Sequence, residues 1–151
     1  MYESELKMID SEVVSLAEAM PADKYNFVPT NGEFKGARTF GEQVTHIAET
    51  IYEVCAPMMG QEMPAEAKAK PDKSKDQIVK YLKASLVYAH KAVAGITDAN
   101  ATEPVANPFN PKNKTTRLYL ASVPIWHSFD HYGQMVVYAR MNGVIPPASK
   151  N

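Results

Sequence analysis

The sequence predicts an all-α fold, arranged as a four-helix bundle. Apolar residues recur every three or four positions along four long segments, which is the spacing of one face of an α-helix. No segment of the sequence shows the two-residue alternation between turn pairs that is typical of a half-buried strand. With 151 residues the chain has the usual length of one domain, so we treat residues 1–151 as a single bundle.

The first helix is expected over about residues 4–19. Pro21 ends it, because proline has no backbone N–H and its ring crowds the preceding turn. The apolar stripe of this helix consists of Leu6, Ile9, Val13, Leu16 and Met20. A long loop that contains Pro29, Gly32 and Gly36 then leads to the second helix.

The second helix is expected to begin after Thr39 and to reach about Met59. Its start matches a capping box, in which the hydroxyl of Thr39 and the carboxylate of Glu42 each accept a hydrogen bond from a free backbone N–H. The apolar arc of this helix consists of Phe40, Val44, Ile47, Ile51, Val54, Cys55 and Met58.

The third helix is expected to begin at Ser74, where Ser74-Lys-Asp-Gln77 also resembles a capping box. Its apolar stripe consists of Ile78, Leu82, Leu86, Ala89, Val93 and Ile96. A loop rich in asparagine and proline, residues 98–114, separates this helix from the last one.

The fourth helix is expected over about residues 115–141. It ends at Asn142-Gly143, because glycine readily takes the left-handed conformation that closes a helix, and the prolines that follow prevent its continuation. Pro124 lies inside this helix and removes one backbone donor, which predicts a kink one turn before His127.

The charge balance argues against a nucleic-acid-binding surface. The formal net charge is -1, from 16 basic and 17 acidic residues. Acidic residues interrupt the lysine-rich stretch at residues 68–80, so no basic face is expected. The start of the chain lacks a basic segment followed by an apolar one, and no run of about 18 apolar residues occurs, so neither export nor a membrane span is expected.

Cys55 is the only cysteine, so no internal disulfide is possible and a reducing cytoplasm is the expected location. Its neighbours Val54 and Met58 are apolar, which indicates a packed thiol. The alternative is a reactive nucleophile.

Two histidines of the last helix are the strongest sign of chemistry. His127 and His131 are four residues apart, which places both rings on one face of the helix, one turn apart. The same face carries apolar residues, so the pair is expected to point inward, where two imidazoles can share a metal ion. His46 adds a third ligand from another helix, and three ligands with an open position are typical of a catalytic metal. The alternative is that each ring is simply a hydrogen-bonded core or surface histidine.

The position of His46 conflicts with this interpretation. His46 lies on the side of the second helix opposite the apolar arc, together with Glu42, Glu49 and Glu53. A solvent-facing His46 is therefore an open alternative. If His46 is a ligand, the site is an open cleft on the polar flank of the helix.

Other polar residues are weaker candidates. Glu49 lies three residues after His46 and is a candidate catalytic base or acceptor near the metal, although an exposed helical glutamate is the commoner case. Gln134 and Tyr138, on the histidine face of the last helix, either line the pocket or pack. His90 has no histidine or carboxylate companion at helical spacing, so it is expected at the surface or in packing.

The last helix is apolar on a second face, which a four-helix bundle does not bury. This face consists of Ile125, Phe129, Tyr132 and Val136, with Trp126 beside it. It predicts a homodimer with two-fold symmetry. The alternative is a loop that folds over the face.

Three segments of the sequence resemble a known family. They are Thr39-Phe-Gly-Glu-Gln-Val-Thr-His46-Ile-Ala, Trp126-His127-Ser-Phe-Asp-His131-Tyr-Gly-Gln134 and Tyr138-Ala-Arg-Met-Asn-Gly-Val-Ile-Pro-Pro. With the run from Met20 to Pro29, they make the chain similar over nearly its whole length to the DinB-like (damage-inducible, DinB/YfiT-type) four-helix metalloproteins.

This resemblance implies a bundle with one long crossover connection, a three-histidine site at His46, His127 and His131 in an open cleft, and frequent homodimers. Related groups resemble metal-dependent hydrolases and S-transferases that use low-molecular-weight thiols. Asp130 stands where the family often has a further histidine, which leaves the number of ligands intact but could alter the hydrogen bonds around them.

We therefore expect one divalent ion per chain, zinc or nickel, that activates water or a thiol for attack on a small substrate. Three neutral imidazoles leave the charge of such an ion uncompensated, so it lowers the pKa of what it binds. The competing hypothesis is a metal-stabilised stress-response or binding protein without turnover. Nucleic-acid binding is suggested only by the historical name of the family and finds no basic face here.

Overall fold

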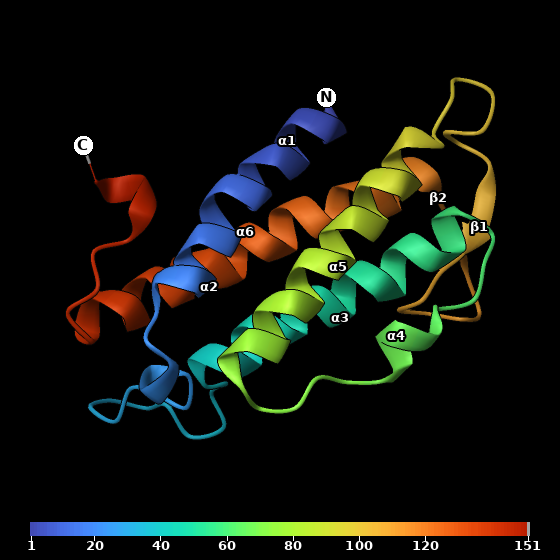
Figure 1. Cartoon of the computed structure of the whole chain (residues 1–151). Coiled ribbons are helices and arrows are strands. Elements are labelled where there is room, and N and C mark those ends of the chain that lie inside the picture. Colours follow the sequence, from blue (N-terminus) through green and yellow to red (C-terminus); the bar gives the residue numbers. More distant parts are fainter. Residues whose placement is uncertain (151) are drawn as a thin grey trace.

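The fold is a bundle of four long helical segments, as predicted (Figure 1). The computed structural model describes residues 1–150. The first segment joins α1 (Tyr2–Ile9), a π-helical stretch (Asp10–Val14) and α2 (Ser15–Ala19) end to end. The other long helices are α3 (Phe40–Met58), α5 (Lys75–Ala94) and α6 (Arg117–Met141). Short helical turns are α4 (Ala65–Lys68), Ala22–Lys24 and Pro147–Ser149.

The connections between the helices explain their arrangement. α3 packs against α5 and α6, and α1 packs against the same two helices, so α1 and α3 lie on opposite sides of the bundle. α3 and α5 run in the same direction (Figure 1). The segment that connects them, which contains α4, therefore has to return from one end of the bundle to the other. This return is the long crossover that the family resemblance implied.

The buried core confirms the predicted apolar stripes. All five predicted stripe residues of the first segment are 0 % exposed: Leu6, Ile9, Val13, Leu16 and Met20. They pack into one cluster with buried residues of the other three long helices, such as Ile47, Leu82 and Leu120. Cys55 belongs to this cluster, and burial raises the pKa of its thiol to about 12, which confirms a packed thiol. Within residues 1–150, no helix is both long and apolar enough to cross a membrane.

The start of α3 is capped as predicted, whereas the start of α5 is not. The hydroxyl of Thr39 accepts from the N–H of Glu42, and the Glu42 carboxylate accepts from the N–H of Thr39. At α5 the side chain of Ser74 caps no backbone N–H. Its hydroxyl donates to the carboxylate of Asp72 instead, so the predicted second capping box was wrong.

The end of α6 confirms the predicted glycine terminus. Gly143 has a φ of 74°, in the left-handed region. The N–H groups of Gly143 and Val144 donate to carbonyl groups of the last helical turn, at 3.0 and 2.9 Å. α6 continues through Pro124, so this proline does not divide the helix.

The loop predicted before the last helix contains a two-stranded antiparallel ribbon. β1 (Pro104–Ala106) pairs with β2 (Lys114–Thr116), with Val105 opposite Thr115. The sequence prediction of a plain loop was wrong here. Each strand has only three residues, which is too short for a two-residue period to be recognised.

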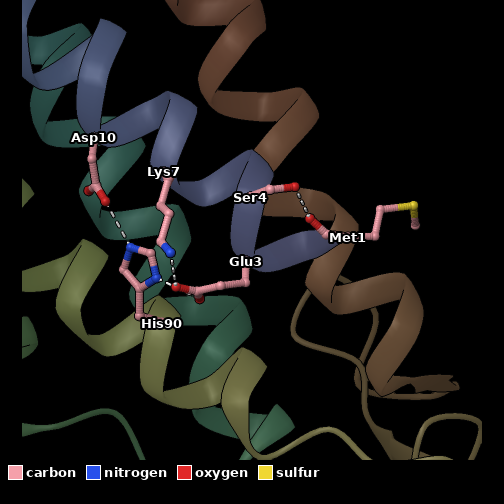
Figure 2. A network of polar contacts seen from close by, with 6 residues as sticks. All are labelled: Met1, Glu3, Ser4, Lys7, Asp10 and His90. Carbon is pink, nitrogen blue, oxygen red and sulfur yellow. Dashed lines mark hydrogen bonds and ion pairs between the residues drawn. The ribbon is translucent and has the colours of Figure 1, made fainter.

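His90 connects α5 to the N-terminal helical segment through two carboxylates (Figure 2). Its Nδ1 lies 2.8 Å from Oε2 of Glu3, and its Nε2 lies 2.8 Å from Oδ2 of Asp10. Lys7 also pairs with Glu3, at 3.7 Å. The sequence prediction considered only companions at helical spacing, so it missed these carboxylates, which lie 87 and 80 positions earlier in the chain.

Candidate metal centre

Three histidines from two helices converge where α3 faces α6. Nε2 of His46 lies 3.2 Å from Nε2 of His127. The ring centroid of His46 is 4.9 Å from those of His127 and His131, whose own centroids are 4.6 Å apart. One nitrogen of each ring lies within 4.8 Å of the corresponding nitrogen of the other two. The structure thus brings together the three residues that the sequence selected.

The spacing of these nitrogens fits a shared metal ion. Imidazole nitrogens bind zinc at about 2.0–2.1 Å, so two of them in a tetrahedral arrangement are about 3.3–3.4 Å apart. The 3.2 Å between the Nε2 atoms of His46 and His127 is close to this value. A direct hydrogen bond would explain only that pair, whereas a shared ion would explain why all three rings converge.

Burial keeps the three imidazoles neutral. Burial and, to a smaller extent, the neighbouring imidazoles lower the pKa of His127 and of His131 to about 4. Burial also lowers the pKa of His46, and the positive charge of Arg38 adds to this effect. Because a metal binds the neutral imidazole, the three rings are in their ligating form at neutral pH.

A chain of side-chain hydrogen bonds orients the ring of His131. Its Nδ1 donates to Oε1 of Gln43, which projects from α3. Nε2 of Gln43 donates to Oε1 of Gln134 at 3.0 Å, and Nε2 of Gln134 lies 3.4 Å from Oδ2 of Asp130. Because Nδ1 of His131 is the donor in this chain, its Nε2 keeps a lone pair for a metal.

The sequence analysis missed Gln43. Its side chain is 2 % exposed, and a buried amide needs hydrogen-bond partners. Gln43 lies outside the apolar arc of α3, so the sequence pattern gave no sign of its burial. Its position three residues before His46, on the same side of the helix, is the signal that could have identified it.

His46 also forms part of the wall of a cavity of about 480 Å³. The start of α3, residues 36–39 and residues 70–73 form most of this wall. His46 is partly exposed, whereas His131 is 6 % exposed and lies deeper. The conflict over His46 is thereby resolved, because the polar flank of α3 faces both the other two histidines and an open cavity.

Glu49, the candidate base, lines the same cavity as His46. Its carboxylate forms an ion pair with Nζ of Lys70 at 2.6 Å. This pairing holds the carboxylate at the cavity wall, and its role in catalysis stays a prediction.

Gln134 and Tyr138 were expected to line the pocket or to pack, and neither belongs to the wall of this cavity. Gln134 takes part in the hydrogen-bond chain behind His131. Tyr138 is buried, and its hydroxyl donates to the carbonyl oxygen of Arg38 at 3.2 Å. Tyr138 therefore anchors the backbone just before α3.

The sequence profile of the DinB superfamily matches residues 5–135. A comparison of this chain with curated proteins found no match. A solved DinB-like protein from Bacillus cereus ATCC 10987 has a TM-score of 0.74 and 19% identity, over 97% of this chain and 98% of that one. A DinB-like protein (YjoA) from Bacillus subtilis has a TM-score of 0.70 and 16% identity, over 94% of this chain and 92% of that one. These structures share the fold, the sequence profile spans most of the chain, and the chain therefore belongs to the DinB superfamily.

Proposed function

We propose that this protein is a metal-dependent enzyme, of hydrolase or S-transferase type. In it, His46, His127 and His131 hold one divalent ion, and water or a low-molecular-weight thiol attacks a small substrate. The convergence of three neutral imidazoles beside a cavity is the observation that supports this proposal. Imidazole suits both zinc and nickel, which are the ions we propose. The buried thiol of Cys55 and the lack of other cysteines favour a cytoplasmic location.

The number of ligands favours catalysis over a structural role. Structural zinc sites have four protein ligands, whereas catalytic sites have three and leave a position for water or substrate. In the described part of the chain, the cluster of possible ligands consists of the three histidines alone. When bound, the ion would lower the pKa of a water or thiol and so supply a nucleophile near neutral pH.

The protein's own groups would orient the reaction. Gln43 fixes the ring of His131, and a small molecule in the cavity would reach the centre from the side of His46. We assign Glu49 the role of general base, because its carboxylate lies on the wall of that cavity. The ion pair with Lys70 engages Oε1 of this carboxylate, so Oε2 is the oxygen that would accept the proton.

Elemental analysis of protein purified without metal-affinity resin tests the metal site. We expect about one zinc or nickel ion per wild-type chain and none in His127→Ala, because two imidazoles remain too few to hold the ion. His90→Ala is the matched control, since His90 contacts Glu3 and Asp10 rather than the cluster. Stoichiometric metal in His127→Ala would refute the assignment.

Turnover is tested next, with low-molecular-weight thiols and small esters or amides as substrates. We expect activity that requires the ion and falls at least about 100-fold in Glu49→Gln, the order of effect of a general base. Full metal loading without turnover of any of these substrates would favour the non-catalytic alternative, a metal-stabilised binding protein.

A further inference from the structure

We propose that the cavity beside His46 recognises an oxyanion of the substrate, a carboxylate or a phosphate, and that Arg38 is the residue that binds it. This inference rests on the proposed function and names the substrate class of the same site. It follows from which charged groups of the cavity wall already have partners and which do not.

Each of the three acidic side chains of the cavity wall already has a hydrogen-bond or ion-pair partner. The Glu42 carboxylate is held by a backbone N–H in the capping box at the start of α3. Glu49 pairs with Lys70 at 2.6 Å. Asp72 accepts hydrogen bonds from the backbone N–H and the hydroxyl of Ser74. Only Glu49 is neutralised by a cation, whereas Glu42 and Asp72 are held by neutral N–H and O–H donors and keep their negative charge, and none of the three pairs with Arg38.

Two cationic side chains on the same wall are unpaired. Between residues 1 and 150, neither the guanidinium of Arg38 nor the ammonium of Lys73 makes an ion pair or a side-chain hydrogen bond. A divalent ion held by neutral imidazoles would add two positive charges without a carboxylate ligand. The formal charges of the wall residues balance, so the bound ion would give the cavity and the centre together a net positive charge, which suits a negative group close to Arg38.

Arg38 is placed to serve both the cavity and the centre. Its positive charge adds to the lowering of the pKa of all three histidines. The bond from Tyr138 to its carbonyl oxygen holds its backbone. Because Arg38 and His46 line one cavity, a single small molecule can contact both. The planar guanidinium presents two parallel N–H groups, which match a carboxylate or a phosphate.

The start of α3 offers no competing anion site. Its first N–H groups already have acceptors, since Phe40 donates to the carbonyl of Phe27 at 2.9 Å and Gly41 to that of Tyr25 at 2.8 Å. The N–H of Glu42 donates to its capping residue. These N–H groups are therefore not available to an oxyanion in this cavity.

Calorimetric titration with three probes tests the proposal. Benzoate and phenyl phosphate carry the two oxyanions, and benzamide is the neutral counterpart of benzoate. Arg38→Gln is compared with Lys35→Gln, which removes the same charge from the same loop but does not line the cavity. We expect at least one anion to bind the zinc-loaded wild type more tightly than benzamide does. That anion should lose about 10-fold in affinity in Arg38→Gln and less than about 2-fold in Lys35→Gln.

The proposal is overturned if neither anion binds more tightly than benzamide. It is also overturned if Arg38→Gln and Lys35→Gln bind the anions with the same affinity. Arg38 is exposed, so its variant should fold, and circular dichroism checks this. The affinity of Lys73→Gln for the same anions measures the contribution of the other unpaired cation of the cavity wall. If elemental analysis shows that the wild type takes up no metal, the proposed function fails, while titration of the metal-free protein by the same criteria still tests Arg38.

Discussion

Gln43 on α3 holds the ring of His131 on α6, because its carboxamide oxygen accepts a hydrogen bond from Nδ1 of that ring. The same carboxamide is 2 % exposed and donates to Gln134 at 3.0 Å, so both of its ends are occupied. The ring of His131 therefore has a defined orientation before any metal binds. This makes Gln43 a positioning residue for the proposed centre.

Replacement of Gln43 by Leu should weaken metal binding by about 10–100-fold, because the ring of His131 loses the acceptor that orients it. Gln43→Glu keeps the oxygen acceptor for His131 but loses the donor to Gln134, so its loss of metal affinity should be smaller than that of Gln43→Leu. Competition with a chromogenic chelator measures both affinities. A Leu variant that folds and binds metal as tightly as the wild type would show that Gln43 serves only the packing.

The sequence could predict the histidine pair, because His127 and His131 lie on one helix and a four-residue separation fixes their relative position. It could not predict which side of α3 faces α6. The apolar arc of α3 turns toward the core, yet His46 and Gln43, which lie outside this arc, contact side chains of α6. Only the packing of the two helices shows that Gln43 is buried.

The helices themselves followed from the sequence, since apolar periodicity and capping residues are local signals. The features that it missed depend on distant contacts. β1 exists because Val105 pairs with Thr115, across the intervening loop. The ion pairs of His90 need Glu3 and Asp10, which lie 87 and 80 positions away in the sequence. A local pattern contains no information about either contact.

His90 should make stability depend on pH (Figure 2). Burial lowers its pKa, but the hydrogen bonds and charges of Glu3 and Asp10 outweigh burial and raise the pKa above the ordinary value of 6.5. The hydrogen bond to His90 lowers the pKa of Glu3, and Lys7 lowers it further. The His90 contribution is complete below 6.5 and is lost as pH rises through the raised pKa, while that of Glu3 is lost as pH falls below about 4.5.

Urea unfolding of metal-free wild type and His90→Gln measures this contribution. The wild type should exceed the variant in free energy of unfolding by more at about pH 5.5 than at about pH 8.5. Taking the difference between the two proteins cancels the titration of the other three histidines. An equal difference at both values of pH would show that the charge of His90 contributes nothing.

Two helical glycines should respond oppositely to alanine. A Cβ on Gly133 would meet nothing within 4 Å, so Gly133→Ala should raise the free energy of unfolding by about 0.5–1 kcal/mol through the better helix propensity of alanine. A Cβ on Gly41 would lie 3.0 Å from the Tyr25 ring and 3.2 Å from the Tyr25 carbonyl oxygen. That oxygen is fixed by the N–H of Gly41, so Gly41→Ala should cost about 1–3 kcal/mol. Denaturant unfolding compares the two variants, and a stabilised Gly41→Ala would contradict the packing described for this turn.

Pairing of two copies through α6 is the remaining prediction. The second apolar face of this helix packs partly against the core, so the bundle covers more of it than the sequence indicated; its residues are Ile125, Phe129, Tyr132 and Val136. Trp126 beside this face is 52% exposed. A two-fold partner would cover Trp126 and the part of this face that stays exposed. Trp126→Glu should therefore weaken the dimer at least about 10-fold, measured by sedimentation over a range of concentrations. Trp126 is exposed in the single chain, so the variant should fold. Because the ring centroids of Trp126 and His127 are 5.8 Å apart, the metal content of the variant has to be checked as well. A wild type that sediments as a monomer at about 100 μM, well above the dissociation constant of a stable dimer, would rule the pairing out.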